Sequence, residues 1–125
     1  GFVTPLWAIV IGGVAGVICY LGVILKGKLG YDDALDVVAV HGLGGLWGAL
    51  ATGIFASVGY QGLLYGNPKQ LLVQAIGAGA AIAYSVVVTF IILKVIDVTV
   101  GLRVDSDKEQ QGLDVAEHSE VGYSI

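Results

Sequence analysis

Residues 1–25, GFVTPLWAIVIGGVAGVICYLGVIL, contain no Asp, Glu, Lys or Arg. A helix of roughly 20 apolar residues crosses the hydrocarbon core of a bilayer, which is about 30 Å thick. Two more runs without these residues follow, at 37–68 and 70–93. We therefore predict an all-α membrane protein with three membrane-spanning helices near residues 6–25, 34–56 and 71–96.

The composition agrees with a membrane location. Hydrophobic residues make up 56% of the chain and charged residues 13%, about half the charged fraction of a typical soluble domain. Many of the 20 glycines lie inside the predicted helices, including Gly12 with Gly16 and Gly44 with Gly48 in G-x-x-x-G spacing. Such small residues let helices approach closely in lipid.

The basic residues predict how the chain is oriented. Three crossings put the loop at 26–36 and the segment after residue 100 on the same side of the membrane. That side is predicted to hold most of the positive charge, so the positive-inside rule places the C-terminus in the cytoplasm of a multi-pass protein of the cell membrane. We expect residues 1–100 to form the transmembrane region and residues 101–125 a cytoplasmic regulatory tail. The basic residues expected on the cytoplasmic side are Lys26, Lys28, Lys94, Arg103 and Lys108, against Lys69 on the other side.

His41 is the one ionisable side chain in the middle of a predicted helix. It follows Asp33 by eight residues, or roughly 12 Å of helix, which places it inside the hydrocarbon region. Desolvation favours the neutral imidazole, which still offers one hydrogen-bond donor and one acceptor. An intramembrane histidine indicates a functional site; the alternative is a structural histidine bonded to a neighbouring helix.

The residues around His41 predict a narrow apolar lining. Val37 lies one turn earlier, and Gly44, Gly45 and Gly48 lie one and two turns later on the same predicted face. One polar group in such a lining suits a small neutral molecule or a proton relay, whereas hydrated metal cations require rings of carboxylates or carbonyls. Asp36 is expected to cap the N-terminus of this helix.

After Val100 the chain becomes acidic, with six Asp and Glu residues between 101 and 125. Ser106-x-x-Glu109 has the spacing of a capping box, and Gly112 is expected to end that short helix before a second one begins near Asp114. Apolar residues within this segment favour a docked tail; the alternative is a solvated, disordered one.

Two motifs together resemble a known family. Residues 32–48, DDALDVVAVHGLGGLWG, resemble the tenth transmembrane helix of the Amt/Mep/Rh ammonium transporters. Residues 101–104, GLRV, resemble the beginning of the cytoplasmic tail in the Amt branch. The resemblance continues at Glu109, Gly112, Leu113, Asp114, Ala116, Glu117, His118 and Tyr123, and it covers essentially the whole chain but only about the last third of a family member.

The resemblance implies an eleven-helix fold, with two five-helix inverted repeats and a final helix, assembled as a homotrimer with one pore per subunit. His41 would be the second of two paired pore histidines and Val37 a pore-lining residue. The implied partners are ammonium or ammonia, the lipid bilayer, the upstream helices of the same protein, and a PII-type signalling protein at the cytoplasmic face. Ala116 stands where some plant relatives carry a regulatory threonine. Residues implied to support the pore helix are Asp36, Gly44, Gly45, Trp47 and Gly48, and those implied in tail regulation are Arg103, Glu109, Gly112, Leu113, Asp114, Glu117, His118 and Tyr123.

Ammonium transport is thus the predicted function, and two alternatives stay open: an ammonium sensor on the same scaffold, and a small structural membrane subunit. The sequence has no pattern typical of an enzyme, a metal site, a cofactor site or a nucleic-acid interface. Because the chain starts at Gly1 almost directly before a helix, we expect it to be a piece of a longer protein; a complete three-helix protein is the alternative.

Overall fold

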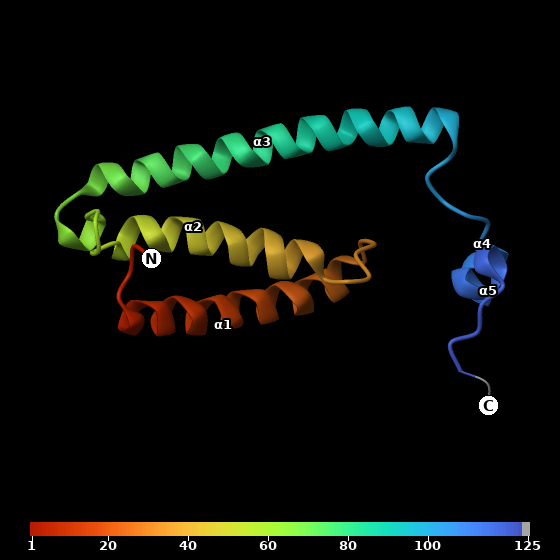
Figure 1. The fold of residues 1–125 in the computed structure, drawn as a ribbon, viewed down its shortest axis with the longest axis horizontal. Coiled ribbons are helices and arrows are strands. Elements are labelled where there is room, and N and C mark those ends of the chain that lie inside the picture. The colour runs from red at the N-terminus through yellow and green to blue at the C-terminus, as the bar shows by residue number, and fades with distance from the viewer. Residues whose placement is uncertain (124–125) are drawn as a thin grey trace. The chain divides into compact units, whose positions relative to one another are not determined.

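The computed structural model describes residues 1–123, and the regular secondary structure in that range is entirely helical (Figure 1). The chain divides into two compact units, residues 1–83 and the part that begins at Tyr84. The first unit contains α1, η1, α2, η2 and the beginning of α3. The second contains the rest of α3 followed by α4 and α5.

Helix α1 spans Pro5–Leu29. Proline suits the first turn of a helix because its missing N–H would have no intrahelical partner there. The helix ends where Gly30 adopts a left-handed conformation with φ 67° and donates its N–H to the Lys26 carbonyl. Glycine adopts this conformation without a steric penalty, so it is a common helix terminator.

The second long helix begins as a π-helix and continues as an α-helix. The π-helical part, η1, spans Val38–Leu43, and α2 spans Gly44–Phe55. The sequence prediction started this helix at residue 34. The observed helix starts later because residues 34–35 form a turn and Asp36 has a φ of 55°, which is incompatible with a right-handed helix.

A short loop connects α2 to α3. It contains the 3₁₀ helix η2, Leu63–Tyr65, and folds back on α2 through Gly62, whose N–H donates to the Ala56 carbonyl at 2.8 Å. Helix α3 then spans Pro68–Thr99, a few residues longer at each end than predicted. It stops at Gly101, which has a φ of 89° and donates its N–H to the Ile96 carbonyl at 3.0 Å.

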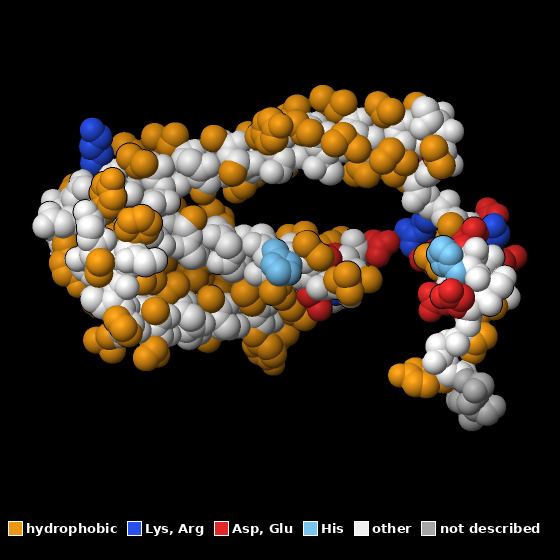
Figure 2. Space-filling model, viewed as in Figure 1, with side chains coloured by type: hydrophobic (Ala, Val, Ile, Leu, Met, Phe, Trp, Pro, Cys, Tyr) orange, Lys and Arg blue, Asp and Glu red, His pale blue; other side chains and the backbone are white. Residues whose placement is uncertain are grey.

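Three helical stretches in the described residues are long and apolar enough to cross a membrane, namely Pro5–Leu29, Val38–Phe55 and Pro68–Thr99. This confirms the predicted class of fold. Large apolar side chains are exposed along α1 and α3 (Figure 2), whereas the buried apolar residues of the described chain are all alanines. Outward apolar surfaces of this size suit contact with lipid or with further helices. The buried alanines are Ala39, Ala51 and Ala56.

The second unit ends in two short helices, α4 at Ser106–Gln111 and α5 at Leu113–His118. Gly112 separates them as predicted, with a φ of 94°. The predicted capping box is wrong: the N-cap residue of α4 is Asp105, and the Glu109 carboxylate binds Arg103 instead of the backbone. A bidentate bond between two charged groups is stronger than a bond to a neutral N–H.

Candidate functional site

His41 lies within the π-helical turn η1, and its side chain is exposed in this chain. A π-helix is wider than an α-helix and occurs mostly as single turns, frequently at functional sites. Val37, one turn before His41, is also exposed, with 48% of its surface accessible. The structure therefore presents the two predicted pore-lining side chains on the outside of the unit formed by residues 1–83.

The opposite side of this helix packs closely on α1. A Cβ added at Gly22 would lie 3.1 Å from the Ala39 Cβ and 2.9 Å from a methyl group of Leu43, and one added at Gly44 would lie 2.9 Å from the Cys19 sulfur. Glycine is thus required for the two backbones to approach at these points.

The prediction that Gly44 shares the open face with His41 is wrong, because Gly44 lies against α1. Gly45 and Gly48 do face open space, since a Cβ added at either one would meet no heavy atom within 4 Å apart from its chain neighbours and the nearby backbone of its own helix. They follow His41 by four and seven residues, which is the spacing of one helix face.

Two hydrogen bonds tie the His41 helix to α1. The Trp47 indole N–H donates to the Ile11 carbonyl at 3.0 Å, and the Cys19 thiol donates to the Val40 carbonyl at 3.6 Å. The second bond reaches the residue directly before His41. Trp47 therefore binds the neighbouring helix.

The helix is capped by Asp33 rather than by Asp36, which corrects the sequence prediction. The Val37 N–H donates to Asp33 Oδ1 at 2.8 Å and the Val38 N–H donates to Asp33 Oδ2 at 3.0 Å. The bond from Val38, followed by that from Val37, holds the pKa of the Asp33 carboxyl below its usual range. Asp36 directly precedes the helix, but its carboxylate forms an ion pair with Lys26 of α1.

Lys26 also binds the loop itself. Its Nζ donates to the Asp33 carbonyl at 2.8 Å in addition to pairing with the Asp36 carboxylate. One ammonium group thus connects the last turn of α1 to Asp33 and Asp36, two of the acidic residues that precede the His41 helix.

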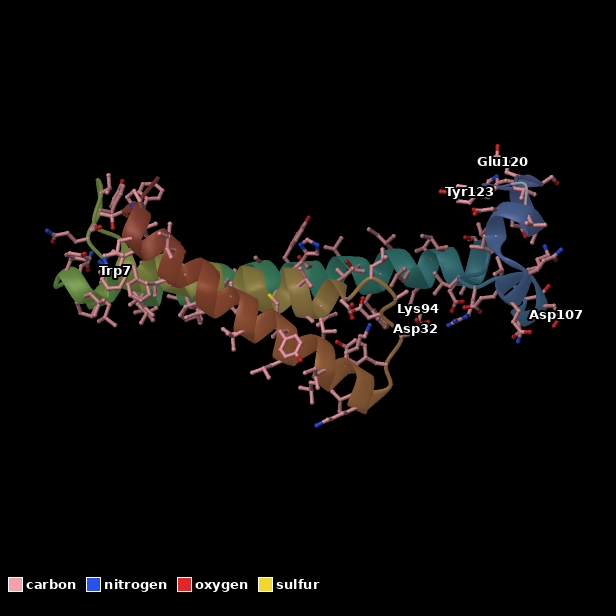
Figure 3. The ribbon with its side chains drawn as sticks, turned by 90° about the horizontal axis from the view of Figure 1, so that it is seen from below. Trp7, Asp32, Lys94, Asp107, Glu120 and Tyr123 are labelled. Atoms are coloured by element: carbon pink, nitrogen blue, oxygen red, sulfur yellow. The ribbon has the colours of Figure 1, made fainter. Side chains whose placement is uncertain are left out.

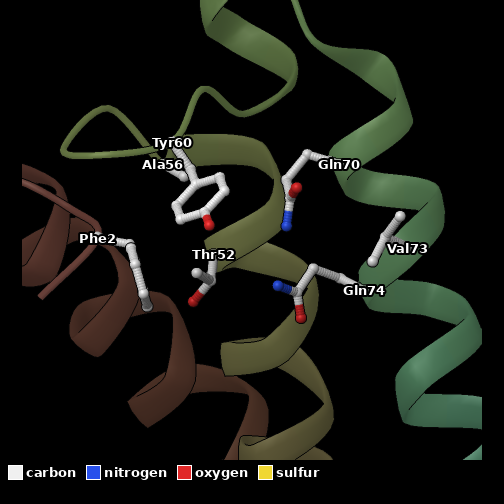
Figure 4. Close-up of a pocket in the computed structure, with 7 residues that line it drawn as sticks. All are labelled: Phe2, Thr52, Ala56, Tyr60, Gln70, Val73 and Gln74. Carbon is white, nitrogen blue, oxygen red and sulfur yellow. The ribbon is translucent and has the colours of Figure 1, made fainter.

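A separate hollow lies at the end of this unit that carries Trp7. Trp7 and Asp32 lie at opposite ends of the unit (Figure 3). The hollow has a volume of about 400 Å³, and the side chains of Gln70 and Gln74 line it opposite Tyr60 (Figure 4). At the same end the Trp7 indole N–H donates to the Tyr65 hydroxyl at 2.8 Å. The two glutamines were not predicted as site residues, although they lie one helical turn apart in an otherwise apolar segment. The other lining residues are Phe2, Thr52, Ala56 and Val73.

In the described part of the second unit, ion pairs organise the tail. The Arg103 guanidinium donates to both carboxylate oxygens of Glu109, at 2.7 and 3.1 Å, and the Lys108 ammonium donates to Glu117 at 2.8 Å. The second pair joins α4 to α5. Each hydrogen bond lowers the pKa of the glutamate that accepts it.

Comparison with known proteins identifies the chain. A profile of the Ammonium Transporter Family matches residues 1–123. The chain belongs to the ammonium transporter family. It is 49% identical to the ammonium transporter Amt1 of Archaeoglobus fulgidus over 99% of its length, and 43% identical to the ammonium transporter of Bacillus subtilis over 98%. A relative named ammonium transporter in Aquifex aeolicus is 49% identical over the whole chain. The chain covers 30% to 32% of these relatives, so it spans about a third of their length.

For this family member, the structure brings together only some of the residues that the sequence singled out. His41, Gly45 and Gly48 have the spacing of one open face, and Asp36 and Trp47 bind α1. The resemblance gave no role to Lys26, Asp33 or Cys19. In the sequence, Asp33 stands out only as a charge near the start of the His41 helix, and Lys26 only as a basic residue at the end of the first span. The other predicted tail residues lie in α5 or after it and are exposed: Leu113, Asp114, His118 and Tyr123.

Proposed function

We propose that this chain is the last part of an Amt-branch protein that transports ammonium across the cell membrane, and that His41 lies on the conduction path. The observation that carries this proposal is the position of His41. It projects from a π-helical turn whose other side is fixed to α1, and the residues that flank it on the open side are Val37, Gly45 and Gly48. Family membership supplies the substrate class, because the relatives are named ammonium transporters.

The chemistry of the imidazole suits this role. A neutral imidazole both donates and accepts a hydrogen bond, so it can pass a small neutral molecule such as ammonia along an apolar passage. It offers no ring of oxygen ligands that would replace the hydration shell of a metal cation. A second histidine, on helices outside this chain, would complete the pair.

The charges that flank the spans support a cytoplasmic tail. Lys26 and Lys28 end α1, and the basic residues of the tail follow the third span. Two crossings separate the two groups, so both lie on one side of the membrane, which the positive-inside rule makes the cytoplasmic side. We infer that the complete protein is an eleven-helix homotrimer in the cell membrane. The ion-paired α4 and α5 are our candidate for the surface that a PII-type protein contacts.

The test is ammonium-evoked current in liposomes that contain the complete protein. Wild type should give a current, and His41→Ala should abolish it or change its selectivity while the trimer stays intact. His118→Ala is the matched control, because it removes the other histidine of this chain from the exposed end of α5. If neither wild type nor His41→Ala carries current although both bind ammonium, the proposal of an electrogenic transporter fails in favour of a sensor or an electroneutral ammonia channel. Loss of the trimer in His41→Ala would instead indicate a structural histidine.

A further inference from the structure

Three charged residues meet where the His41 helix begins. Lys26 comes from the last turn of α1, and Asp33 and Asp36 come from the segment that leads into η1. The apolar contacts between the two helices lie further along, toward Gly22 and Cys19. The charged cluster therefore attaches α1 to the segment that directly precedes the π turn.

We propose that Lys26 is a positioning residue for His41: by tying Asp33 and Asp36 to α1, it sets the backbone from which the π turn starts. The inference rests on the proposed function for its consequence in transport. The predicted structural effect on the imidazole does not depend on the proposed function and is measured separately.

The first step of the argument is the backbone of Asp36. Its φ of 55° is a conformation that residues other than glycine rarely adopt and that persists only when surrounding groups hold it. The side chain of Asp36 is held by the Lys26 ammonium. Since the same ammonium binds the Asp33 carbonyl at 2.8 Å, it fixes the segment at both ends of the turn formed by residues 34–35.

The second step is the path from Asp36 to His41. The Asp36 carbonyl accepts the Val40 N–H at 2.9 Å, and Val40 directly precedes His41. The Val40 carbonyl in turn accepts the Cys19 thiol. A rotation of the Asp36 backbone therefore breaks a bond within the turn that carries His41.

The third step is that the two aspartates have different roles. Asp33 caps the helix through the N–H groups of Val37 and Val38, and this requires its carboxylate to stay beneath the helix N-terminus. Lys26 binds the Asp33 carbonyl rather than its carboxylate. The Lys26 ammonium thus holds the Asp33 backbone and leaves the Asp33 carboxylate free to bind the helix N–H groups. The carboxylate that neutralises the ammonium is that of Asp36.

The experiment uses the complete trimer in lipid, with Lys26→Met, Lys26→Arg and the control Lys28→Met. Lys28 is in the same last turn of α1, is exposed, and has no ion pair among residues 1–123. The first readout is solid-state NMR of ¹⁵N-labelled histidine, with the His41 signal assigned by its absence in His41→Ala. The second readout is the initial rate of ammonium uptake.

Lys26→Met should shift the His41 imidazole signal and lower the uptake rate about tenfold, since a displacement near 1 Å at a reacting or binding group costs up to 10²-fold. Lys26→Arg should keep the imidazole signal and the uptake rate close to those of wild type, and Lys28→Met should change neither the signal nor the rate. An unchanged His41 signal in Lys26→Met, or an equal shift in Lys28→Met, would overturn the proposal.

A second variant covers the case in which Lys26→Met does not assemble. Asp36→Asn retains the size of the side chain and removes its charge, so it should reproduce the imidazole shift; an unshifted signal would refute the role of the cluster. Where both single variants assemble, the double variant should shift the signal no further than either one. If wild type transports no ammonium, the proposed function fails, but the His41 signal still decides the positioning role.

Discussion

Replacing Gly44 with alanine tests the close contact between α1 and α2. The added Cβ would lie 2.9 Å from the Cys19 sulfur, closer than real Cβ atoms approach a neighbour. Overpacking of this kind typically costs about 1–3 kcal/mol. The sulfur cannot turn away freely, because its present rotamer allows the thiol to bind the Val40 carbonyl.

Two effects set the net size of the change. Alanine is favoured over glycine in a helix by about 1 kcal/mol, which offsets part of the steric cost. We therefore expect Gly44→Ala to lower the free energy of unfolding by about 1 kcal/mol. The measurement is unfolding of the purified complete protein by SDS in mixed micelles, followed by the fluorescence of its tryptophans.

A double-mutant cycle isolates the contact. Cys19→Ala removes the sulfur, so Gly44→Ala introduced into that background should meet no clash and should stabilise the protein slightly. The predicted coupling between the two sites is about 1–2 kcal/mol. If the two changes add within about 0.5 kcal/mol, the two residues do not touch and the described packing of α1 on α2 is wrong.

Three further changes test other parts of the structure. Trp47→Phe removes the indole donor to the Ile11 carbonyl and should lower the free energy of SDS unfolding by about 1 kcal/mol; no change would mean that the bond is absent. Arg103 lowers the pKa of Glu109 below its ordinary value of 4.5, so the pair should stabilise the tail fully above that pH and lose its effect as the pH falls through the lowered pKa. Limited proteolysis of the tail should show increased cleavage in that acidic range, and Glu109→Gln should be cleaved readily even at neutral pH. Gly112→Ala places a Cβ at a φ of 94° and should destabilise the junction of α4 and α5 by about 1–3 kcal/mol, seen as faster amide hydrogen exchange in α5.

The three spans could be predicted from the sequence because the signal is local. A stretch such as residues 1–25 must be apolar along its whole length to cross a bilayer, and no knowledge of neighbouring helices is needed. The ends of the helices were less accurate. Gly30 and Gly101 stop α1 and α3 by adopting positive φ values, a choice that depends on how the following chain continues.

The details around His41 could not be predicted in the same way. Both Asp33 and Asp36 have the right chemistry for a helix cap, and proximity favoured Asp36. What decides between them is Lys26, which is ten residues from Asp36 along the chain but adjacent to it in space. Likewise, nothing in the local sequence distinguishes Gly44, which must admit Cys19, from Gly45, which faces open space.

The distribution of these contacts explains why a π turn is tolerated at His41. A wider turn loses some backbone hydrogen bonds of an α-helix, and in lipid the freed groups need other partners. Here the Cys19 thiol binds the Val40 carbonyl and the Asp33 carboxylate binds the first N–H groups of the helix. Both partners lie on the α1 side or below the helix. The irregular turn is therefore held from the side that faces α1, and the exposed imidazole lies on the other side.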